Sequence, residues 1–347
     1  MKALCYQGPK DIRYETVADP VLEDSRDVLV KMEACGICGS DLHIYHGFDL
    51  SDNRNCGYTV GHEAVGEIVE IGKEVRNFKP GDRVMLSASV GCGTCHSCLS
   101  GNVQACTTGP MRIYGLGRSL AGCQAEAIRV PVADFNAARV PEGISLEQAV
   151  MLTDNLPTAW FGCLNADIKP GDTVAVIGLG PIGLMAVESA FLFGASRVFA
   201  IDLIADRRHI AAKLGAIPLD PSSAVEEIRD ATHGRMASCA IEAVGLETTI
   251  QLAISLVAKQ GAISVIGAGV DLCKNFPIRE LLTRNLTFRA GVCSVQDYWE
   301  RLVPLLQHGR LHPEQFVTHT LPLAQGRHAY QMFDTRSDGA LKMIMKP

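Results

Sequence analysis

The 347-residue sequence lacks the features that would direct it to a membrane or a nucleic acid. No charged N-terminal region precedes an apolar core, as a secretory signal would require, and no apolar run is long enough to span a bilayer. Positive charge is not in excess, because the formal net charge is −6, and the basic residues form no patch with interleaved aromatics. We therefore expect a cytoplasmic protein that binds neither nucleic acid nor a membrane.

Internal repeats, low-complexity segments and a disulfide framework are also missing. The thirteen cysteines are an odd number, and in a reducing compartment they serve metal binding, catalysis or core packing. Eight of them are most simply read as small hydrophobic core residues: Cys5, Cys35, Cys56, Cys123, Cys163, Cys239, Cys273 and Cys293. Four others are crowded between residues 92 and 106, and that crowding needs a cause.

Three regions of the chain differ in their pattern of apolar runs. Residues 1–154 contain short β-like runs, such as DVLVKM and EAVGEIVEI, which predict a largely antiparallel, barrel-like domain. Residues 155–293 alternate apolar strands with helical patterns, which predicts an α/β domain with a doubly wound parallel sheet. Residues 294–347 offer one helix around YWERLVPLLQHG and a terminal strand, ALKMIMK. We expect this tail to return to the first domain, with a cleft between the two domains.

A glycine-rich loop, VAVIGLGPIG, follows the first strand of the second domain. Gly178, Gly180 and Gly183 have the GxGxxG spacing between a strand and a helix, which is typical of dinucleotide sites. Gly178 permits the tight turn, Gly180 lets a pyrophosphate approach, and Gly183 allows the helix to pack on the strand. Pro181 and Ile182 begin the helix, whose N-terminus would face the phosphates.

Asp202 ends the second strand of this domain, nineteen residues after Gly183. A carboxylate there accepts hydrogen bonds from a ribose diol and repels a 2′-phosphate, which favours NAD over NADP. Arg207 follows on the next helix and could line the adenosine site or support some NADP binding. The alternative is an ordinary strand-to-helix turn with a solvated aspartate.

The crowded cysteines lie in the segment CGTCHSCLSGNVQAC, within a lobe at about 91–107. Cys92, Cys95, Cys98 and Cys106 have the spacing C-x2-C-x2-C-x7-C, and four such thiolates can close a tetrahedral shell around structural zinc. An iron–sulfur cluster fits less well, because no proline follows the fourth cysteine and no second cysteine run exists.

Two further segments carry a resemblance to a known family. CGICGSDLH, at 35–43, and GHEAVGEIVEIGKEV, at 61–75, precede the cysteine lobe and the glycine loop in the family's order. With them, the chain resembles the zinc-dependent alcohol dehydrogenases of the medium-chain dehydrogenase/reductase superfamily, most closely the tetrameric bacterial enzymes. The resemblance covers nearly the whole chain and implies a GroES-like catalytic domain joined to a Rossmann domain.

The resemblance also implies a second zinc, held for catalysis. Its ligands would be Cys38, His62 and Asp154, which stands in MLTDNLPTAW where the liver-type enzymes have a cysteine. Glu63 matches a family glutamate that can approach as an alternative ligand. Three protein ligands and one open position are the catalytic arrangement of zinc. Asp154 has a competing interpretation as a helix cap.

The same resemblance assigns the residues around the metal. Ser40 and His43 would relay the alcohol proton to the surface, Asp41 would support a ligand, and Thr158 would pack beside the nicotinamide. Four residues are candidates for the substrate pocket: His46, Phe48, Leu116 and Trp160. For His46, a solvent-facing position in a loop is an equal alternative. The chain departs from the family in GCQAEAIRV, where Ala127 replaces a frequent aromatic residue and leaves the pocket shape open.

The sequence thus predicts NAD-dependent oxidation of a primary or secondary alcohol, including aromatic ones. A polyol or amino-alcohol dehydrogenase of the sorbitol or threonine type is an alternative, and so is a non-catalytic, zinc-stabilised NAD-binding protein. The resemblance implies a homotetramer, with a dimer as the alternative, and the sheet edge near FRAGVC could pair with a partner's edge.

Overall fold

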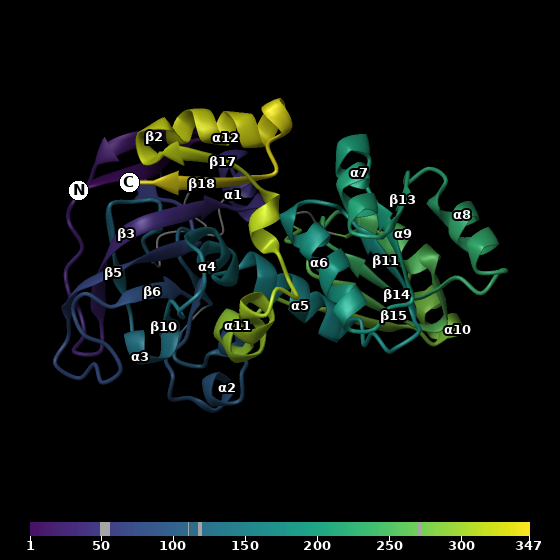
Figure 1. The fold of residues 1–347 in the computed structure, drawn as a ribbon, viewed down its shortest axis with the longest axis horizontal. Coiled ribbons are helices and arrows are strands. Elements are labelled where there is room, and N and C mark those ends of the chain that lie inside the picture. The colour runs from purple at the N-terminus through teal and green to yellow at the C-terminus, as the bar shows by residue number, and fades with distance from the viewer. Residues whose placement is uncertain (49–55, 110, 117–119, 270–272) are drawn as a thin grey trace. The chain divides into compact units, whose positions relative to one another are not determined.

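The structure is a computed structural model that describes residues 1–48, 56–109, 111–116, 120–269 and 273–347. The chain divides into two compact units (Figure 1). Unit 1 combines Met1–Pro157 with Cys293–Pro347, and unit 2 is Thr158–Val292. Within the described residues, no helix has both the length and the apolar character needed to cross a membrane.

Unit 1 is built on a seven-stranded sheet. Its strands are β10 (Ala137–Arg139), β6 (Arg83–Leu86), β5 (Ala64–Ile71), β3 (Val28–Ile37), β18 (Lys342–Lys346) and β17 (Val317–Pro322) in spatial order, and β9 (Ala127–Val130) also pairs with β3. All of these pairings are antiparallel except that of β17 with β18, so the largely antiparallel region predicted from the sequence is confirmed. Along β3 only Lys31 is exposed, and several of its side chains belong to the apolar core of unit 1.

Smaller sheets and helices complete unit 1. The strands are β1 (Lys2–Gly8), β2 (Asp11–Thr16) and β4 (Tyr58–Thr59) in one sheet, and β7 (Ser89–Val90) with β8 (Arg112–Ile113) in another. The helices are α1 (Gly39–Tyr45), α2 (His96–Leu99), α3 (Ala133–Asn136), α4 (Leu146–Leu152), α11 (Trp299–Gln307) and α12 (Gly326–Thr335). A capping box starts α4, since the Ser145 hydroxyl accepts from the Gln148 amide at 3.1 Å, and α4 ends just before Asp154.

The C-terminal tail contains more structure than the sequence predicts. The expected helix is α11 and the expected strand is β18, but β17 and α12 were not anticipated. β18 pairs antiparallel with β3, with Met343 opposite Ile37. The last strand therefore lies directly beside the segment that leads into Cys38.

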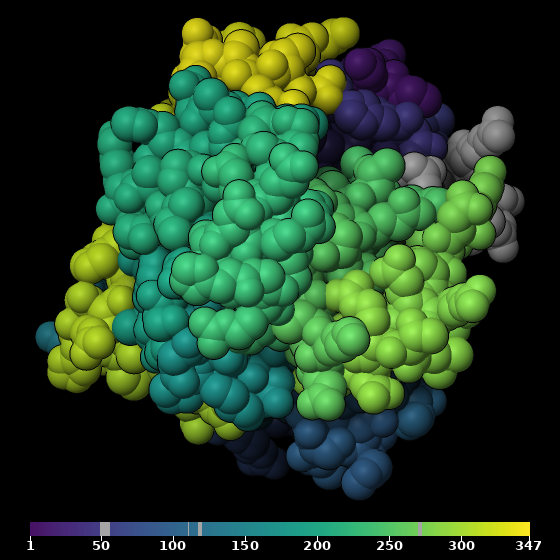
Figure 2. Space-filling view, turned by 90° about the vertical axis from the view of Figure 1, so that its right-hand side faces the viewer, coloured from purple at the N-terminus to yellow at the C-terminus, as the bar shows by residue number. Residues whose placement is uncertain are grey.

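Unit 2 is a six-stranded sheet in the order β13 (Ile217–Leu219), β12 (Arg197–Ile201), β11 (Thr173–Ile177), β14 (Ala237–Glu242), β15 (Val257–Val265) and β16 (Thr287–Ala290). Its helices are α5 (Asn155–Asn165, which begins in unit 1), α6 (Pro181–Leu192), α7 (Ala205–Lys213), α8 (Ala224–Ala231), α9 (Glu247–Leu256) and α10 (Ile278–Arg284). Every strand pairing is parallel, which confirms the doubly wound sheet. Figure 2 faces this unit, and segments coloured teal through light green form most of the surface in view.

Two cysteines correct the sequence analysis. Cys56 and Cys273 are exposed, although both were expected in the core, whereas the other six of that group are buried. Cys56 precedes β4 and Cys273 precedes α10, so neither belongs to a helix or strand that would carry it into a core. A cysteine is buried by its neighbours in the fold, and residue type alone does not reveal them.

Candidate metal centres and dinucleotide loop

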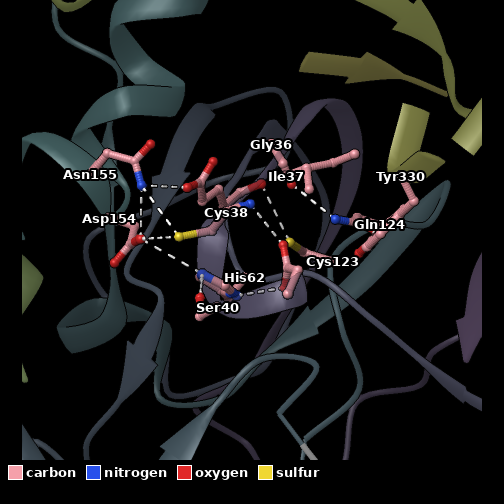
Figure 3. Close-up of polar contacts among 12 residues, drawn as sticks. Gly36, Ile37, Cys38, Ser40, His62, Cys123, Gln124, Asp154, Asn155 and Tyr330 are labelled. Carbon is pink, nitrogen blue, oxygen red and sulfur yellow. Dashed lines mark hydrogen bonds and ion pairs between the residues drawn. The ribbon is translucent and has the colours of Figure 1, made fainter. Parts of the chain in front are cut away.

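Four potential metal ligands converge in unit 1 from segments far apart in the sequence. Cys38 stands between β3 and α1, His62 and Glu63 precede β5, and Asp154 stands between α4 and α5. One donor atom from each lies within 4.8 Å of all the others. Cys38, His62 and Asp154 point toward one another in Figure 3. The fold therefore assembles the ligand set that the family resemblance implies.

The distances within this cluster suit a tetrahedral metal. Asp154 Oδ2 lies 3.4 Å from Cys38 Sγ and 3.7 Å from His62 Nε2. Zinc bonds of about 2.0–2.3 Å place neighbouring donors of a tetrahedron roughly 3.3–3.8 Å apart. Burial, followed by the Asp154 carboxylate, raises the pKa of the Cys38 thiol. The residues thus fit a zinc ion, whose charge would keep that sulfur as a thiolate.

Asp41 supports two of the ligands. Its Oδ2 accepts a hydrogen bond from the Cys38 backbone amide at 2.9 Å, and its Oδ1 lies 3.2 Å from His62 Nδ1. Burial alone would lower the pKa of His62, but the Asp41 and Asp154 carboxylates outweigh it and raise that pKa well above its ordinary value. With Nδ1 turned to Asp41, Nε2 is the nitrogen that faces the other ligands, as metal-binding histidines require.

The sequence reasoning missed two buried residues beside Glu63. Lys342 Nζ forms an ion pair with Glu63 Oε2, and both side chains are fully buried. Asn155 Nδ2 donates to Glu63 Oε1 at 2.7 Å. Burial raises the pKa of Glu63, and Lys342 opposes that rise. The signal for Lys342 was a lysine inside the apolar run ALKMIMK, and the signal for Asn155 was its place directly after a candidate ligand.

Ser40 and His43 both lie on α1. Ser40 Oγ is 3.2 Å from His62 Nε2, so this hydroxyl reaches the edge of the ligand cluster (Figure 3). His43 follows three residues later, which places it on the same side of the helix as Ser40. The proton-relay role of Ser40 and His43 stays a prediction.

A buried polar chain supports the end of β3 behind the cluster. Gln124 Nε2 donates to the Gly36 carbonyl at 2.9 Å, and the Tyr330 hydroxyl donates to Gln124 Oε1 at 2.9 Å (Figure 3). Tyr330 belongs to α12 and is fully buried. The C-terminal helix thus helps to fix the backbone that presents Cys38.

The four residues suggested for the substrate pocket have varied surroundings. His46 is exposed and pairs with Asp334 at 2.7 Å, while Leu116 packs against the apolar core of unit 1. Phe48 is half-buried, and its backbone amide bonds to the His43 carbonyl. Trp160 belongs to unit 2, where its ring lies 4.5 Å from that of Phe193. The assignment of these residues to a substrate pocket stays a prediction.

The cysteine lobe gathers its four thiols around α2. One sulfur from each lies within 4.8 Å of the others, and Cys92 Sγ is 3.9 Å from Cys98 Sγ, close to the edge of a tetrahedral zinc–thiolate site. The Thr94 hydroxyl is the main cause that lowers the pKa of Cys92 to about 5. Backbone amides, that of Thr107 first, lower the pKa of Cys95 to about 7. The lobe therefore fits a closed metal shell.

Hydrogen bonds join the lobe to the segment at 293–297, where the chain returns to unit 1. The Val103 amide donates to Ser294 Oγ at 2.9 Å, and Gln104 Nε2 donates to the Cys293 carbonyl at 2.8 Å. Gly101 lies so close to Asp297 that an added Cβ would come within 2.8 Å of its carboxylate. These contacts hold the lobe against the return segment at 293–297.

The glycine loop in unit 2 has the shape of a dinucleotide site. Gly178 has a φ of +87°, and a Cβ on Gly183 would lie 1.8 Å from the Gly178 carbonyl oxygen. A Cβ on Gly180 would meet no atom within 4 Å, so the surface there is open to an approaching phosphate. Pro181 is the first residue of α6, and Ile182 stands beside it in the first turn. These positions match the roles expected of the motif.

Asp202 follows β12 and is held in place by the backbone. Its Oδ2 accepts from the Leu179 amide at 2.7 Å, and its Oδ1 accepts from the Ile204 amide at 2.8 Å. Arg207 lies 4.0 Å from Oδ2. Leu203, beside Asp202, has a side chain that is 80% exposed. A fixed carboxylate next to an exposed apolar side chain suits an adenosine ribose and its base, and sequence reasoning missed Leu203.

Comparison with known proteins matches the chain along most of its length. Residues 24–142 match the alcohol dehydrogenase GroES-like domain, and residues 181–308 match the zinc-binding dehydrogenase family. A probable zinc-binding alcohol dehydrogenase of Mycobacterium tuberculosis is 43% identical over 350 residues, covering 100% of this chain and 89% of the relative. An uncharacterized zinc-type alcohol dehydrogenase-like protein of Bacillus subtilis is 32% identical over 381 residues, covering 100% of both. The structure of alcohol dehydrogenase TADH from Thermus sp. ATN1 is 37% identical, with a TM-score of 0.94 and 100% coverage of both chains.

Proposed function

The chain belongs to the zinc-binding alcohol dehydrogenases, and we propose that it moves a hydride between a small alcohol and NAD at a zinc held by Cys38, His62 and Asp154. The convergence of these three donors with Glu63, all within 4.8 Å, is the observation that carries the proposal. Zinc bound there would act as a Lewis acid that eases loss of the alcohol proton, and NAD would take the hydride.

The chain's own residues bind the metal and move the proton. Cys38 and His62 are held by Asp41, which fixes the sulfur-bearing backbone and the histidine ring. Ser40 Oγ, at the edge of the cluster, would accept the alcohol proton while its own hydroxyl proton passes to the cofactor ribose, and His43 would then take up a proton from that ribose and carry it outward. Glu63 stays beside the ligands, and its pair with Lys342 offsets its charge.

NAD is the proposed cofactor, and Asp202 supports that choice over NADP. Two backbone amides hold the Asp202 carboxylate where a ribose diol would bind, so it cannot turn away from a 2′-phosphate. Arg207 would line the adenosine site, and Thr158, in α5, would lie beside the nicotinamide. Replacement of Asp202 by glycine should lower the kcat/KM ratio of NAD to NADP, measured with one alcohol and both cofactors.

A second zinc in the cysteine lobe is proposed to be structural. Four cysteines already supply a complete tetrahedral shell, so no position remains for substrate. We therefore expect two zinc ions per chain.

The decisive experiment combines metal analysis with a substrate panel. Zinc per chain is measured together with NAD reduction on primary, secondary, aromatic, polyhydroxy and amino alcohols. Two zinc ions with turnover on one alcohol class would support the proposal and identify the substrate class, including the polyol and amino-alcohol alternatives. One zinc without turnover on any alcohol would contradict it and favour a non-catalytic NAD-binding protein.

Self-association through unit 2 is proposed from the edge strand β16. Among the residues that the structure describes, this strand pairs only with β15, and Leu282 and Val292 near it are 71% and 51% exposed. A second copy of the chain could continue the sheet there, giving a dimer from which a tetramer is built. Light scattering tests this, because a monomer mass would contradict it.

A further inference from the structure

Asn155, the first residue of α5, directly follows Asp154, and its side chain is 1% exposed. Its Nδ2 faces Glu63 Oε1 at 2.7 Å, Asp154 Oδ2 at 3.0 Å and Cys38 Sγ at 3.7 Å. Building on the proposed function, we propose that Asn155 is a positioning residue that keeps Glu63 out of the coordination position which the alcohol must occupy.

An amide nitrogen has two hydrogens to donate, and here it has three acceptors. The two short contacts join Asn155 to both carboxylates, and the longer one goes to the sulfur. Asp154 Oδ2 is the same oxygen that faces Cys38 and His62, so it is the oxygen aimed at the metal. Asn155 therefore bridges the carboxylates of Asp154 and Glu63; its contact with Asp154 is drawn in Figure 3.

Glu63 is held from two sides. Asn155 occupies Oε1, and Lys342 occupies Oε2. A Cβ added at Gly36 would lie 1.8 Å from Oε2, so the carboxylate packs directly on the backbone of β3 and cannot move in that direction. A donor oxygen of Glu63 already lies within 4.8 Å of the donor atoms of Cys38, His62 and Asp154, so a small movement of the carboxylate toward them would bring it into the shell of a bound metal.

The two contacts that fix the Glu63 carboxylate differ in their chemistry. Lys342 offsets the charge of Glu63, which leaves Asp154 as the stronger ligand for a cation. Asn155 supplies a directed hydrogen bond to the second oxygen, and without it that oxygen would be buried and unpartnered. Because an unsatisfied buried acceptor is costly, and Lys342 is already engaged by Oε2, we expect Glu63 to turn Oε1 toward a metal bound by the ligand cluster.

The consequence of losing the amide is a closed metal site. Four protein ligands would complete the tetrahedral shell, as four cysteines do in the lobe, and leave no position for an alcohol. The expected signature is an enzyme that keeps its metal but loses its exchangeable coordination position. A side chain that merely fills space would give the opposite signature, which is loss of metal.

The test compares the wild type with Asn155→Leu, which keeps similar bulk and removes the donor, in the cobalt-substituted protein. Imidazole is titrated as a monodentate probe of the exchangeable position, and visible absorption reports its binding to cobalt. We expect imidazole to bind at least about tenfold more weakly to the variant, and kcat/KM for the alcohol to fall by a similar factor, the scale seen for residues that support metal ligands. Metal content should be unchanged.

A double variant distinguishes positioning from structural support. Asn155→Leu with Glu63→Gln removes the carboxylate that would enter the metal shell, so imidazole binding should recover to near the value of Glu63→Gln alone. Thr153→Val is the matched control, because this neighbouring residue is fully buried and its hydroxyl donates to the Val150 carbonyl at 2.6 Å. Its imidazole titration should match the wild type. Asn155→Ala replaces Asn155→Leu if the latter does not fold.

Two outcomes would overturn the inference. In one, the Asn155 variant binds imidazole as tightly as the wild type. In the other, its activity falls only in proportion to lost metal and Glu63→Gln rescues nothing. Failure of the proposed function is a separate result, since a wild type that binds imidazole at cobalt but oxidises no alcohol would still permit the Asn155 comparison.

Discussion

The two four-donor clusters of unit 1 are built in opposite ways. The lobe takes all its ligands from Cys92 to Cys106, one short segment around α2. The proposed catalytic centre takes donors from the end of β3, the start of β5 and the α4–α5 junction. One cluster forms from local chain geometry, whereas the other exists only when the large sheet has folded.

That difference extends to the groups around the ligands. In the lobe, nearby backbone amides and the Thr94 hydroxyl donate to Cys92, and the Cys98 amide donates to Cys95, so the local chain lowers the pKa of these two thiols, whereas burial raises that of Cys98. In the catalytic cluster, the supporting groups include Lys342, which is 279 residues from its partner Glu63. We therefore expect the stability of the lobe to depend mainly on its bound metal. The geometry of the catalytic cluster should depend mainly on the folding of the large sheet.

The largest expected effect separates the two clusters by activity. Cys38→Ala or His62→Ala should abolish measurable alcohol oxidation and leave one zinc per chain, because each change removes a ligand of the catalytic centre and leaves the lobe intact. Zinc analysis and NAD reduction measure both effects. Cys163→Ala, a buried thiol of unit 2, is the control and should keep both zinc ions. Wild-type rates in either ligand variant would refute the mechanism.

The next effect tests the dependence of the catalytic cluster on the fold. Lys342→Met leaves Glu63 as an uncompensated buried charge, so the free energy of unfolding of the metal-free protein should fall by about 3–5 kcal/mol. Denaturant unfolding measures the loss. Adding Glu63→Gln should recover a large part of it, because the isolated charge is then gone. Equal stability of the single and double variants would mean that the ion pair contributes nothing through its charge.

The contrast between the clusters also explains what the sequence could predict. The lobe was readable because its four cysteines share one segment, and the glycine loop because strand, turn and helix are consecutive. Cys38, His62 and Asp154 were proposed through the family resemblance, since no spacing between residues 38, 62 and 154 reveals their proximity. The parallel and antiparallel sheets followed from hydrophobic patterns and are confirmed.

What the sequence did not predict depends on long-range pairing. Lys342 faces Glu63 because β18 pairs with β3, a partnership that no local pattern records. Asn155 acquires its role from acceptors at residues 38 and 63. The partner of His46, Asp334, lies on α12, a helix that the sequence reading of the tail did not include. Each missed group is a contact between segments that are distant in the chain.

A smaller effect is expected from breaking the local cluster. Cys95→Ser should remove the lobe zinc and with it the stability that this one ion gives to unit 1, about 2.7 kcal/mol when free zinc is a hundredfold above its Kd. Chelator-dependent thermal unfolding of wild type and variant measures this difference. The catalytic metal should be retained, so folded chains still oxidise alcohol. Loss of both metals would show that the clusters are coupled, through the return segment at 293–297 that the lobe contacts.

The smallest effect concerns His46, which directly follows α1, the helix that carries Ser40. His46 follows α1 and is largely exposed, and its pair with Asp334 is a surface interaction of about 0–1 kcal/mol. His46→Gln should therefore change the free energy of unfolding by no more than that and leave zinc content unchanged. The KM for the alcohol is the informative measurement. An unchanged KM would mean that α1 contributes to the site only through its first turns. A KM raised severalfold would place His46 in the substrate pocket and extend the site to the end of α1.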